Sequence, residues 1–344
     1  MASNKVIVTG GAGYIGSHTC IELIQAGYDV IVVDNLSNSD EKSLDRIEKI
    51  AGSRPTFYNT DVTDAAALSQ IFAKEGEVAG IIHFAAKKAV GESVEKPLLY
   101  YKVNLGGLTN VLQQMTDHQI AHLIFSSSCT VYGEATELPV TEDSPILPAA
   151  SPYGNTKQIG EEIIRDYAVA RDGAVKAVAL RYFNPVGAHA SGLIGELPLG
   201  VPSNLMPYIT QTAAGLRDRL SVFGSDYDTP DGTAIRDYIH VVDLAKAHVA
   251  ALESLIDERQ KDSYEVYNLG TGRGSTVLEV IQSFERVSGL KLSHQIVGRR
   301  PGDVEAIYGA TARANQKLGW KAELTLDDMT RSAWLWEKNL RGIN

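Results

Sequence analysis

Short apolar runs alternate with amphipathic stretches through the first half of the chain. Six runs rich in Val, Ile and Phe are apolar on both sides, which is typical of parallel strands covered on both faces. They are Lys5–Thr9, Asp29–Asp34, Thr56–Thr60, Gly80–Phe84, His122–Ser127 and Lys176–Tyr182. Helical patterns lie between them, for example at Ser17–Ala26 and Tyr101–Met115. This order predicts an α/β fold with a doubly wound parallel sheet of the Rossmann type.

The pattern changes after Asn184. Residues 185–203 contain several Gly and Pro and show little periodicity, which is typical of a loop that reaches over a ligand. Further helices are predicted at 205–216, 241–255, 276–288 and 326–339. We therefore predict a cofactor lobe over residues 1–183, with a return segment near 237–266. A smaller, mixed α/β substrate lobe is predicted over 184–236 and 267–344.

Three glycines follow the first apolar run at the spacing Gly-x-x-Gly-x-x-Gly: Gly10, Gly13 and Gly16. Such glycines let the backbone turn tightly and approach a pyrophosphate, and the helix that begins near Ile15 offers free N–H groups to the phosphate charge. Asp34 ends the second run, where a carboxylate can bind ribose hydroxyls and would repel a 2′-phosphate. The sequence therefore predicts a site for NAD rather than NADP.

A second motif places a tyrosine and a lysine on one helical face. Ser151 and Pro152 are suited to the start of a helix, on which Tyr153 and Lys157 lie four positions apart. The ammonium, together with the positive charge of NAD⁺, should lower the tyrosine pKa from ~10 toward neutrality and make it a general base. A Tyr-x-x-x-Lys pair alone is common, but the serine run 126–128 ends a predicted strand at the edge where such sheets bind ligands. Alternation along the strand leaves open which serine faces the site.

Composition narrows the function further. The formal net charge is −10, which disfavours nonspecific nucleic-acid binding but allows a small anionic substrate. Neither Cys20 nor Cys129 has a metal-ligand spacing, and we predict no metal site. No apolar run approaches the ~18 residues of a membrane span, so we expect no membrane association. The first strand begins at Lys5, without room for a cleavable signal, so we predict a cytoplasmic protein.

The glycine motif, Asp34, the serine run ending at Ser128 and the pair Tyr153 and Lys157 together resemble the extended short-chain dehydrogenase/reductase family. The resemblance is strongest to its members that act at C4 of UDP-hexoses, and it runs over nearly the whole chain. It implies NAD-dependent inversion of C4 of UDP-glucose and UDP-galactose through a transient 4-keto sugar. It also implies that Ser128, Tyr153 and Lys157 are catalytic.

The resemblance assigns binding residues as well. Those for NAD are Gly10, Gly13, Tyr14, Ile15, Gly16, Asp34, Asn35, Leu36, Asn38, Ser39, Asp61, Val62, Phe84, Ala85, Lys88, Tyr153, Lys157 and Tyr182. Those for the UDP-sugar are Lys88, Ser128, Tyr153, Asn184, Asn204, Leu205, Ser221, Val222, Phe223, Arg236, Arg300, Asp303 and Ile307. Arginines are suited to clamp a diphosphate with paired N–H donors, although an ion pair with Asp237 or Asp303 is the ordinary alternative for each.

Two further expectations come from the resemblance. The position of Ile307 gates the sugar pocket in the family, where tyrosine excludes N-acetylated sugars and a small residue admits them. Because isoleucine is smaller than tyrosine, we expect some turnover of UDP-N-acetylglucosamine and UDP-N-acetylgalactosamine. The family also implies a homodimer through the helices near Tyr101–Met115 and Tyr153–Ala168, where Val103, Leu108 and Leu112 could face either the partner or the sheet.

Rival functions remain. The nearest is a nucleotide-sugar 4,6-dehydratase, or another NAD-dependent UDP-sugar epimerase. Such dehydratases place an Asp-Glu pair after the strand-end hydroxyl, where this chain has Cys129 and Thr130. A non-catalytic NAD-binding protein is the alternative of a different class, and relatives of that kind typically lack the tyrosine–lysine pair.

Overall fold

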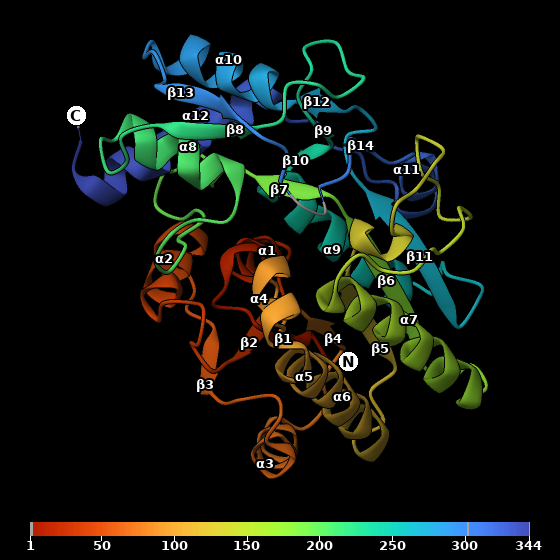
Figure 1. Ribbon diagram of the computed structural model, residues 1–344. Helices are drawn as coiled ribbons and strands as arrows, with labels where there is room; N and C mark the ends of the chain where they lie inside the picture. The colour runs from red at the N-terminus through yellow and green to blue at the C-terminus, as the bar shows by residue number, and fades with distance from the viewer. Residues whose placement is uncertain (1–2, 301–302, 344) are drawn as a thin grey trace.

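The computed structural model describes residues 3–300 and 303–343. Its centre is a sheet of seven parallel strands in the order β3-β2-β1-β4-β5-β6-β11 (Figure 1). The strands are β1 (Lys5–Thr9), β2 (Asp29–Asp34), β3 (Thr56–Asn59), β4 (Gly80–His83), β5 (His122–Ser128), β6 (Lys176–Tyr182) and β11 (Tyr264–Leu269). All six predicted strands are confirmed, each with its ends within one residue. The doubly wound parallel sheet is confirmed with them.

Both faces of this sheet are buried, as the continuous apolar runs required. Val6 and Val8 point into one core and Ile7 into the other, because successive side chains of a strand face opposite sides. The first face is covered by α1 (Tyr14–Gln25), α2 (Lys42–Ala51), α9 (Val241–Ile256) and α11 (Ala312–Leu318). The other is covered by α3 (Ala65–Glu75), α6 (Gly106–Asp117) and α7 (Pro152–Ala170).

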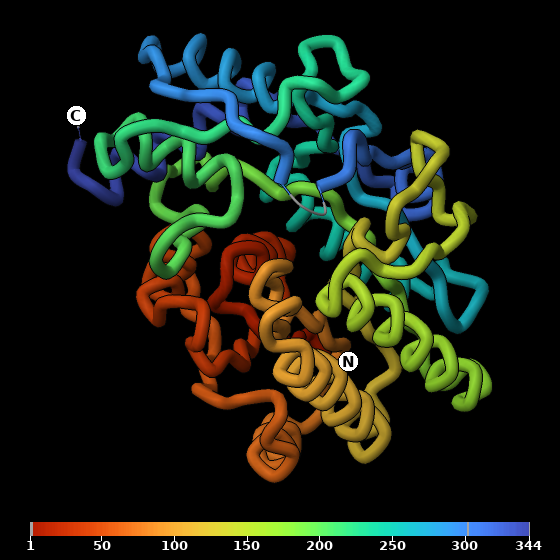
Figure 2. Tube along the Cα trace, viewed as in Figure 1, coloured from red at the N-terminus to blue at the C-terminus, as the bar shows by residue number. Residues whose placement is uncertain are grey.

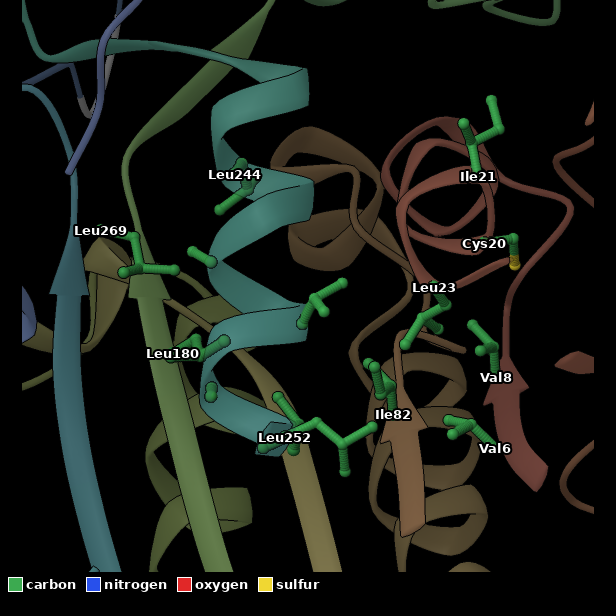
Figure 3. Packing of buried hydrophobic residues seen from close by; sticks show 14 of the residues in the cluster. Val6, Val8, Cys20, Ile21, Leu23, Ile82, Leu180, Leu244, Leu252 and Leu269 are labelled. Carbon is green, nitrogen blue, oxygen red and sulfur yellow. The ribbon is translucent and has the colours of Figure 1, made fainter. Parts of the chain in front are cut away.

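Helix α9 contributes much of the first core. Figure 3 shows its Leu244 and Leu252 packed between Leu180 on one side and Leu23 on the other. Each of these leucines is fully buried. Burial of a leucine side chain contributes about 1.5–3 kcal/mol, so the cofactor lobe depends on a helix that follows it by many residues in the chain.

The remaining elements form a second lobe above the sheet in Figure 1 and small connecting sheets. Its core gathers around Val222, Phe284 and Met329. These elements are β7 (Asn184–Val186), α8 (Leu205–Ala213), β8 (Leu220–Phe223), β9 (Ile235–Arg236), β10 (Tyr238–His240), β12 (Ser275–Thr276), α10 (Val277–Ser288), β13 (His294–Val297), β14 (Ala306–Ile307) and α12 (Leu326–Arg341).

The return segment is longer than the sequence suggested. Strand β11 pairs with β6 and runs to Leu269, three residues beyond the predicted limit at 266. Helix α11 also packs on the first lobe, through Ala314 and Leu318. The first three residues of β11 are only half-buried, so the strand lacks the continuous apolar run of its neighbours. Figure 2 follows the chain from the red and orange segments through green and blue, with teal α9 and β11 back at the first lobe.

The predicted helix over Tyr101–Met115 is divided. Two short helices, α4 (Val90–Glu95) and α5 (Pro97–Tyr100), precede a π-helical turn at Tyr101–Leu105, and α6 follows. Among the residues that the structure describes, none of the helices is both long enough and apolar enough to span a membrane.

Candidate active site

The predicted NAD-binding residues gather at one edge of the sheet. Most of them follow the carboxyl ends of β1, β2, β3 and β4, while Tyr153 and Lys157 lie on α7 and Tyr182 ends β6. The ends of the strands share an edge because the strands are parallel. Phe84 follows β4 and Tyr182 ends β6, yet both rings pack on the buried ring of His248, at centroid distances of 4.7 and 5.6 Å. The fold therefore joins residues that the sequence places nearly 100 positions apart.

The glycine loop has the shape that a dinucleotide needs. Gly10 has φ +72°, and a Cβ there would lie 2.7 Å from the backbone nitrogen of Ala85. A Cβ on Gly16 would lie 2.3 Å from the Gly10 carbonyl oxygen, so only glycine lets α1 approach the loop. Gly13 occupies the N-cap of α1 without a side-chain cap, which leaves the first N–H groups of the helix for an anion. The loop thus fits a pyrophosphate.

Asp34 is held in place by three donors. Its Oδ2 accepts from the Ala12 N–H at 3.1 Å, and its Oδ1 accepts from the Leu36 N–H and the Ser39 hydroxyl, each at 2.9 Å. A carboxylate offers about four acceptor positions, so capacity remains for ribose hydroxyls. The side chain of Asn35 donates to Asp61 at 2.8 Å and joins the ends of β2 and β3, while Asn38 is exposed.

Val62 does not present its side chain to the site. That side chain is 5% exposed and packs in the core against α6, and the Val62 carbonyl accepts from the Asn110 amide at 3.0 Å. The predicted contact of Val62 with NAD is therefore restricted to the rest of its main chain.

Tyr153 and Lys157 begin α7, as the motif predicted. Ser151 caps the helix by accepting from the Gly154 N–H at 3.2 Å, and Pro152 takes the first helical position. The Lys157 Nζ donates to the Ser126 carbonyl at 2.6 Å and lies 5.8 Å from the centroid of the Tyr153 ring. The tyrosine and the lysine are thereby fixed against the end of β5.

The three serines of the run have different partners. Ser126 accepts from the Tyr182 hydroxyl and Ser127 donates to Glu161 on α7, whereas Ser128 lowers the pKa of Tyr153 in part. Ser128 also accepts from the Thr130 N–H at 3.2 Å. Ser128 is thus the serine of the run that acts on Tyr153, and the hydroxyls of the other two bind Tyr182 and Glu161.

The protein's own groups do not lower the pKa of Tyr153, contrary to the expectation from the motif. Burial raises the pKa of Tyr153 to about 12, and the hydrogen bond from Ser128 opposes this only in part. Burial also lowers the pKa of Lys157 to about 8. Burial disfavours the charged form of both side chains, so a Tyr153 phenolate needs further positive charge nearby.

The predicted arginine clamp lies across the second lobe. Arg236 donates to the Asp303 carboxylate and to the Val304 carbonyl, and Arg300 donates to Asp303 at 3.3 Å. The Arg300 guanidinium lies 5.7 Å from the Phe223 ring centroid. Four predicted substrate residues therefore form one cluster, and Asp303 holds both arginines, as the ion-pair alternative anticipated.

A second cluster connects the two lobes. Lys88 follows β4, and its Nζ lies 3.6 Å from the Glu196 carboxylate, which also accepts from the Asn204 amide at 2.7 Å. Sequence reasoning predicted Lys88 and Asn204 but not Glu196. The segment around Glu196 has no periodic pattern, so nothing local marks its carboxylate as the link.

Other predicted substrate residues differ in what they can offer. Val222 is fully buried in the second core, so its side chain cannot contact a UDP-sugar, whereas Ser221 is half-buried and Phe223 is 40% exposed. Leu205 packs on the same core at the start of α8, and Asn184 pairs with Tyr238 in the small sheet of β7 and β10.

Ile307 lies in a small apolar cluster beside the reaction site. It is 7% exposed and packs with Val131, Tyr132 and Phe183, and Cys129 borders the same cluster. Because Cys129 follows Ser128 in the chain, this cluster borders the turn after Ser128. Ile307 also aligns with Arg236 across β14 and β9.

Asn104 is a further residue that sequence reasoning missed. On the π-helical turn, its amide donates to the Lys87 carbonyl and to the Thr156 hydroxyl, each at 3.0 Å, and its oxygen accepts from the Lys87 N–H at 2.8 Å. It thereby ties the loop after β4 to the first turn of α7. A π-helical turn among helical residues is often a mark of function, but it has no sequence signature.

No group of three or more His, Cys, Asp or Glu side chains suited to a metal occurs within residues 3–300 and 303–343. His118 and His122 are four apart, but His118 follows α6 and His122 opens β5, so they do not share a helix face.

Fold and site together define an α/β enzyme of the class that binds a dinucleotide and modifies a nucleotide sugar. The family model described as GDP-mannose 4,6 dehydratase matches residues 7–333. UDP-glucose 4-epimerase 2 of Arabidopsis thaliana is 53% identical over 340 residues, which cover 98% of this chain and 96% of that protein.

Solved structures agree. The UDP-glucose 4-epimerase of Stenotrophomonas maltophila, with bound NAD and formylated UDP-arabinopyranose, has a TM-score of 0.94 at 47% identity and covers 99% of both chains. That of Bifidobacterium longum, in complex with NAD⁺ and UDP, has a TM-score of 0.93 at 50% identity and covers 99% of this chain and 100% of the other. The chain belongs to the extended short-chain dehydrogenase/reductase family and, within it, to the UDP-glucose 4-epimerases.

Proposed function

We propose that this chain interconverts UDP-glucose and UDP-galactose by inverting C4, with NAD bound throughout turnover. The observation that carries the proposal is the joining of Ser128, Tyr153 and Lys157 at the sheet edge, between a dinucleotide loop and an arginine cluster. The ligands of the two related structures, NAD with UDP or with a UDP-sugar, match the two halves of this site. The 4,6-dehydratase alternative is disfavoured because Cys129 and Thr130 stand where it would need an acid and a base.

The chain's own residues divide the work. When bound, NAD supplies a reversible acceptor for the C4 hydride and an added positive charge. Tyr153, as a phenolate that Lys157 stabilises, accepts the proton of the sugar 4-hydroxyl as the hydride leaves C4, and becomes a neutral phenol. Ser128 donates a hydrogen bond to the sugar oxygen. After the 4-keto sugar has turned its opposite face to the site, C4 would take the hydride back on that face while Tyr153 returns the proton to the oxygen, and C4 is inverted.

The arginine cluster explains how the sugar can turn. Arg236 and Arg300 are suited to hold the diphosphate, since both guanidiniums already bind a carboxylate at this position. Binding energy placed on UDP leaves the hexose loosely held, as a rotation between two hydride transfers requires. Lys88 of the first lobe and Asn204 of the second, joined by Glu196, would contact the substrate as well.

A coupled assay on protein purified without added NAD tests this function. We expect UDP-galactose to be converted to UDP-glucose without external cofactor, and denatured protein to release NAD. A preparation that holds no dinucleotide, and leaves UDP-galactose unchanged even with excess NAD, would contradict the proposal. Formation of a 4-keto-6-deoxy product would instead support the dehydratase.

Ile307 leads to a prediction about substrate range. We propose that the apolar cluster of Ile307 and Phe183 leaves room for an N-acetyl group, so that UDP-N-acetylglucosamine is also turned over. Ile307→Tyr adds a bulky ring there and should lower kcat/KM for the N-acetylated sugar at least tenfold while sparing UDP-galactose. One extra or missing methylene group in an apolar pocket already changes specificity by about 10-fold or more.

Paired assays with both sugars measure the effect. Ile146→Tyr is the control, because Ile146 is 48% exposed and outside the cluster, and it should leave both activities unchanged. Absence of any turnover of UDP-N-acetylglucosamine by the unmodified chain would refute the proposed range.

We also propose a homodimer that works in the cytoplasm. Leu108 and Leu112 cannot form its interface, because both are buried in the core under α6. Val103 is half-buried, and exposed apolar residues near these helices include Val94 on α4, Leu98 on α5 and Val169 on α7, which are 62%, 81% and 65% exposed. Light scattering should give twice the mass of the chain, and a monomer at micromolar concentration would contradict the dimer.

A further inference from the structure

A buried ion pair joins α7 to β6, one helical turn beyond Lys157 of the reaction site. Arg181 on β6 donates to Glu161 on α7 through two parallel bonds, from Nε to Oε1 at 2.9 Å and from Nη2 to Oε2 at 2.6 Å. Their side chains are 5% and 4% exposed. This bidentate geometry is the strongest form of a charged hydrogen bond and fixes both partners in direction.

The pair connects five segments around the site. Ser127 of β5 donates to Glu161, and Arg181 Nη1 donates to the Tyr132 hydroxyl at 3.1 Å, in the turn that follows Ser128. Tyr132 in turn donates to Asn268 of β11 at 2.6 Å. Helix α7, the ends of β5, β6 and β11, and the turn after Ser128 are therefore held by one network.

Stability alone does not account for this network. Taking two charges out of water costs several kcal/mol each, and well-packed apolar residues often serve as well or better. The adjacent core positions of α7 and β6, such as Ile164 and Leu180, are indeed apolar. A charged pair at this place is better explained by its effect on Lys157, which lies one helical turn away.

Glu161 is one turn beyond Lys157 on the same helix, and its negative charge favours the protonated lysine. The other groups that face Lys157 are Tyr153 on α7, His83 on β4, and the Phe125 ring and Ser126 carbonyl of β5. Burial lowers the pKa of His83 to about 3, so this imidazole is neutral near pH 7.

The groups that face Glu161 are Arg181 on β6, Ser127 on β5 and Tyr264 on β11. Burial raises the pKa of Tyr264 well above its usual range, so this phenol is neutral as well. Glu161 is therefore the anion among the described residues around Lys157, and Arg181 fixes where that anion lies.

We propose that the Glu161–Arg181 pair is the positioning element of the reaction: it fixes the first turns of α7 against the ends of β5 and β6 and keeps Lys157 charged. This inference rests on the proposed function, in which Lys157 must carry its proton to stabilise the Tyr153 phenolate. Burial alone works against that proton, and Glu161 offsets burial without entering the site. Glu161 thus acts through Lys157 and touches neither substrate nor cofactor.

The test is the pH profile of kcat for UDP-galactose in the NAD-loaded protein. In the unmodified chain, kcat should fall on the alkaline side as Lys157 loses its proton. Glu161→Gln removes the charge with almost no change in shape and should move this alkaline limb to lower pH by about one unit or more, the smaller end of what a nearby opposite charge produces. At pH 8 kcat should fall about fivefold or more, as a one-unit shift from a pKa of about 8 produces, whereas KM should change less than threefold.

Matched variants separate charge from packing. Ser127→Ala removes one hydrogen bond to Glu161 but keeps its charge, and Glu162→Gln makes the same substitution at the exposed neighbour. Both should leave the alkaline limb within about 0.3 units of the unmodified chain. Glu161→Met with Arg181→Met removes both charges and leaves none unpaired, so it should fold even where Glu161→Gln does not, and its alkaline limb should move in the same direction by a smaller amount.

The outcomes are distinct. An inactive unmodified chain would overturn the proposed function itself. An active chain in which both Glu161→Gln and the double variant keep the alkaline limb and kcat within twofold would overturn this inference alone. A displaced limb in Ser127→Ala would also overturn it, because packing rather than charge would then control Lys157.

Discussion

Replacement of Tyr153 by phenylalanine should lower kcat for UDP-galactose by about 10²–10⁴-fold, the range that a positioned acid–base group supplies. Phenylalanine keeps the ring that packs near Lys157 and removes only the hydroxyl that receives the proton. Bound NAD and the melting temperature should therefore change little. Initial rates, together with the dinucleotide released on denaturation, measure the two effects separately.

Tyr101→Phe is the control for that experiment. The Tyr101 hydroxyl accepts from the Asn155 amide at 2.7 Å, so it contacts the same turn of α7 but not Ser128. This variant should keep kcat within about threefold. If Tyr153→Phe retained a tenth or more of the activity, the phenol would not be the base, and the proposed division of labour would be wrong.

Gly10→Ala should release NAD and abolish turnover. Two terms add: a residue with a side chain at φ +72° is strained by about 1–3 kcal/mol, and its Cβ would lie 2.7 Å from the Ala85 nitrogen. The collision partner is backbone, so the loop after β4 must move away from the cofactor edge. We expect bound NAD after purification to fall at least tenfold.

Gly27→Ala tests the effect of backbone strain at positive φ without a steric clash of the new Cβ. Gly27 has φ +91°, but a Cβ there meets no atom within 4 Å. This variant should lose about 1 kcal/mol of stability, a few degrees in melting temperature, and keep its NAD. Full NAD content in Gly10→Ala would show that the loop does not form the pyrophosphate site.

Local physics explains which parts of this molecule were predictable. Strands β1, β2, β4, β5 and β6 are buried on both faces, so each left a largely apolar run in the sequence. Tyr153 and Lys157 could be placed on one face because Ser151 and Pro152 fix where α7 begins. In each case the determinants lie within a few residues of one another.

The features that were missed depend on distant partners. Glu196 gains its role from Lys88 and Asn204, and the three residues come from separate segments. The upward shift of the Tyr153 pKa follows from burial, which neither the four-residue spacing nor the type of residue reveals. β11 is half-exposed along its first residues and acquires its place only by pairing with β6.

The late arrival of α9 and β11 has a consequence for synthesis. Until residue 269 has left the ribosome, the nascent sheet lacks strand β11 beside β6. Before α9 has emerged, the face of the sheet that it covers exposes Leu180 and Leu23. The cofactor lobe is therefore complete only when most of the polypeptide has emerged. A translation product that stops near residue 183 would expose a sticky apolar surface, so we expect it to be captured by chaperones or degraded rather than persist as an independent module.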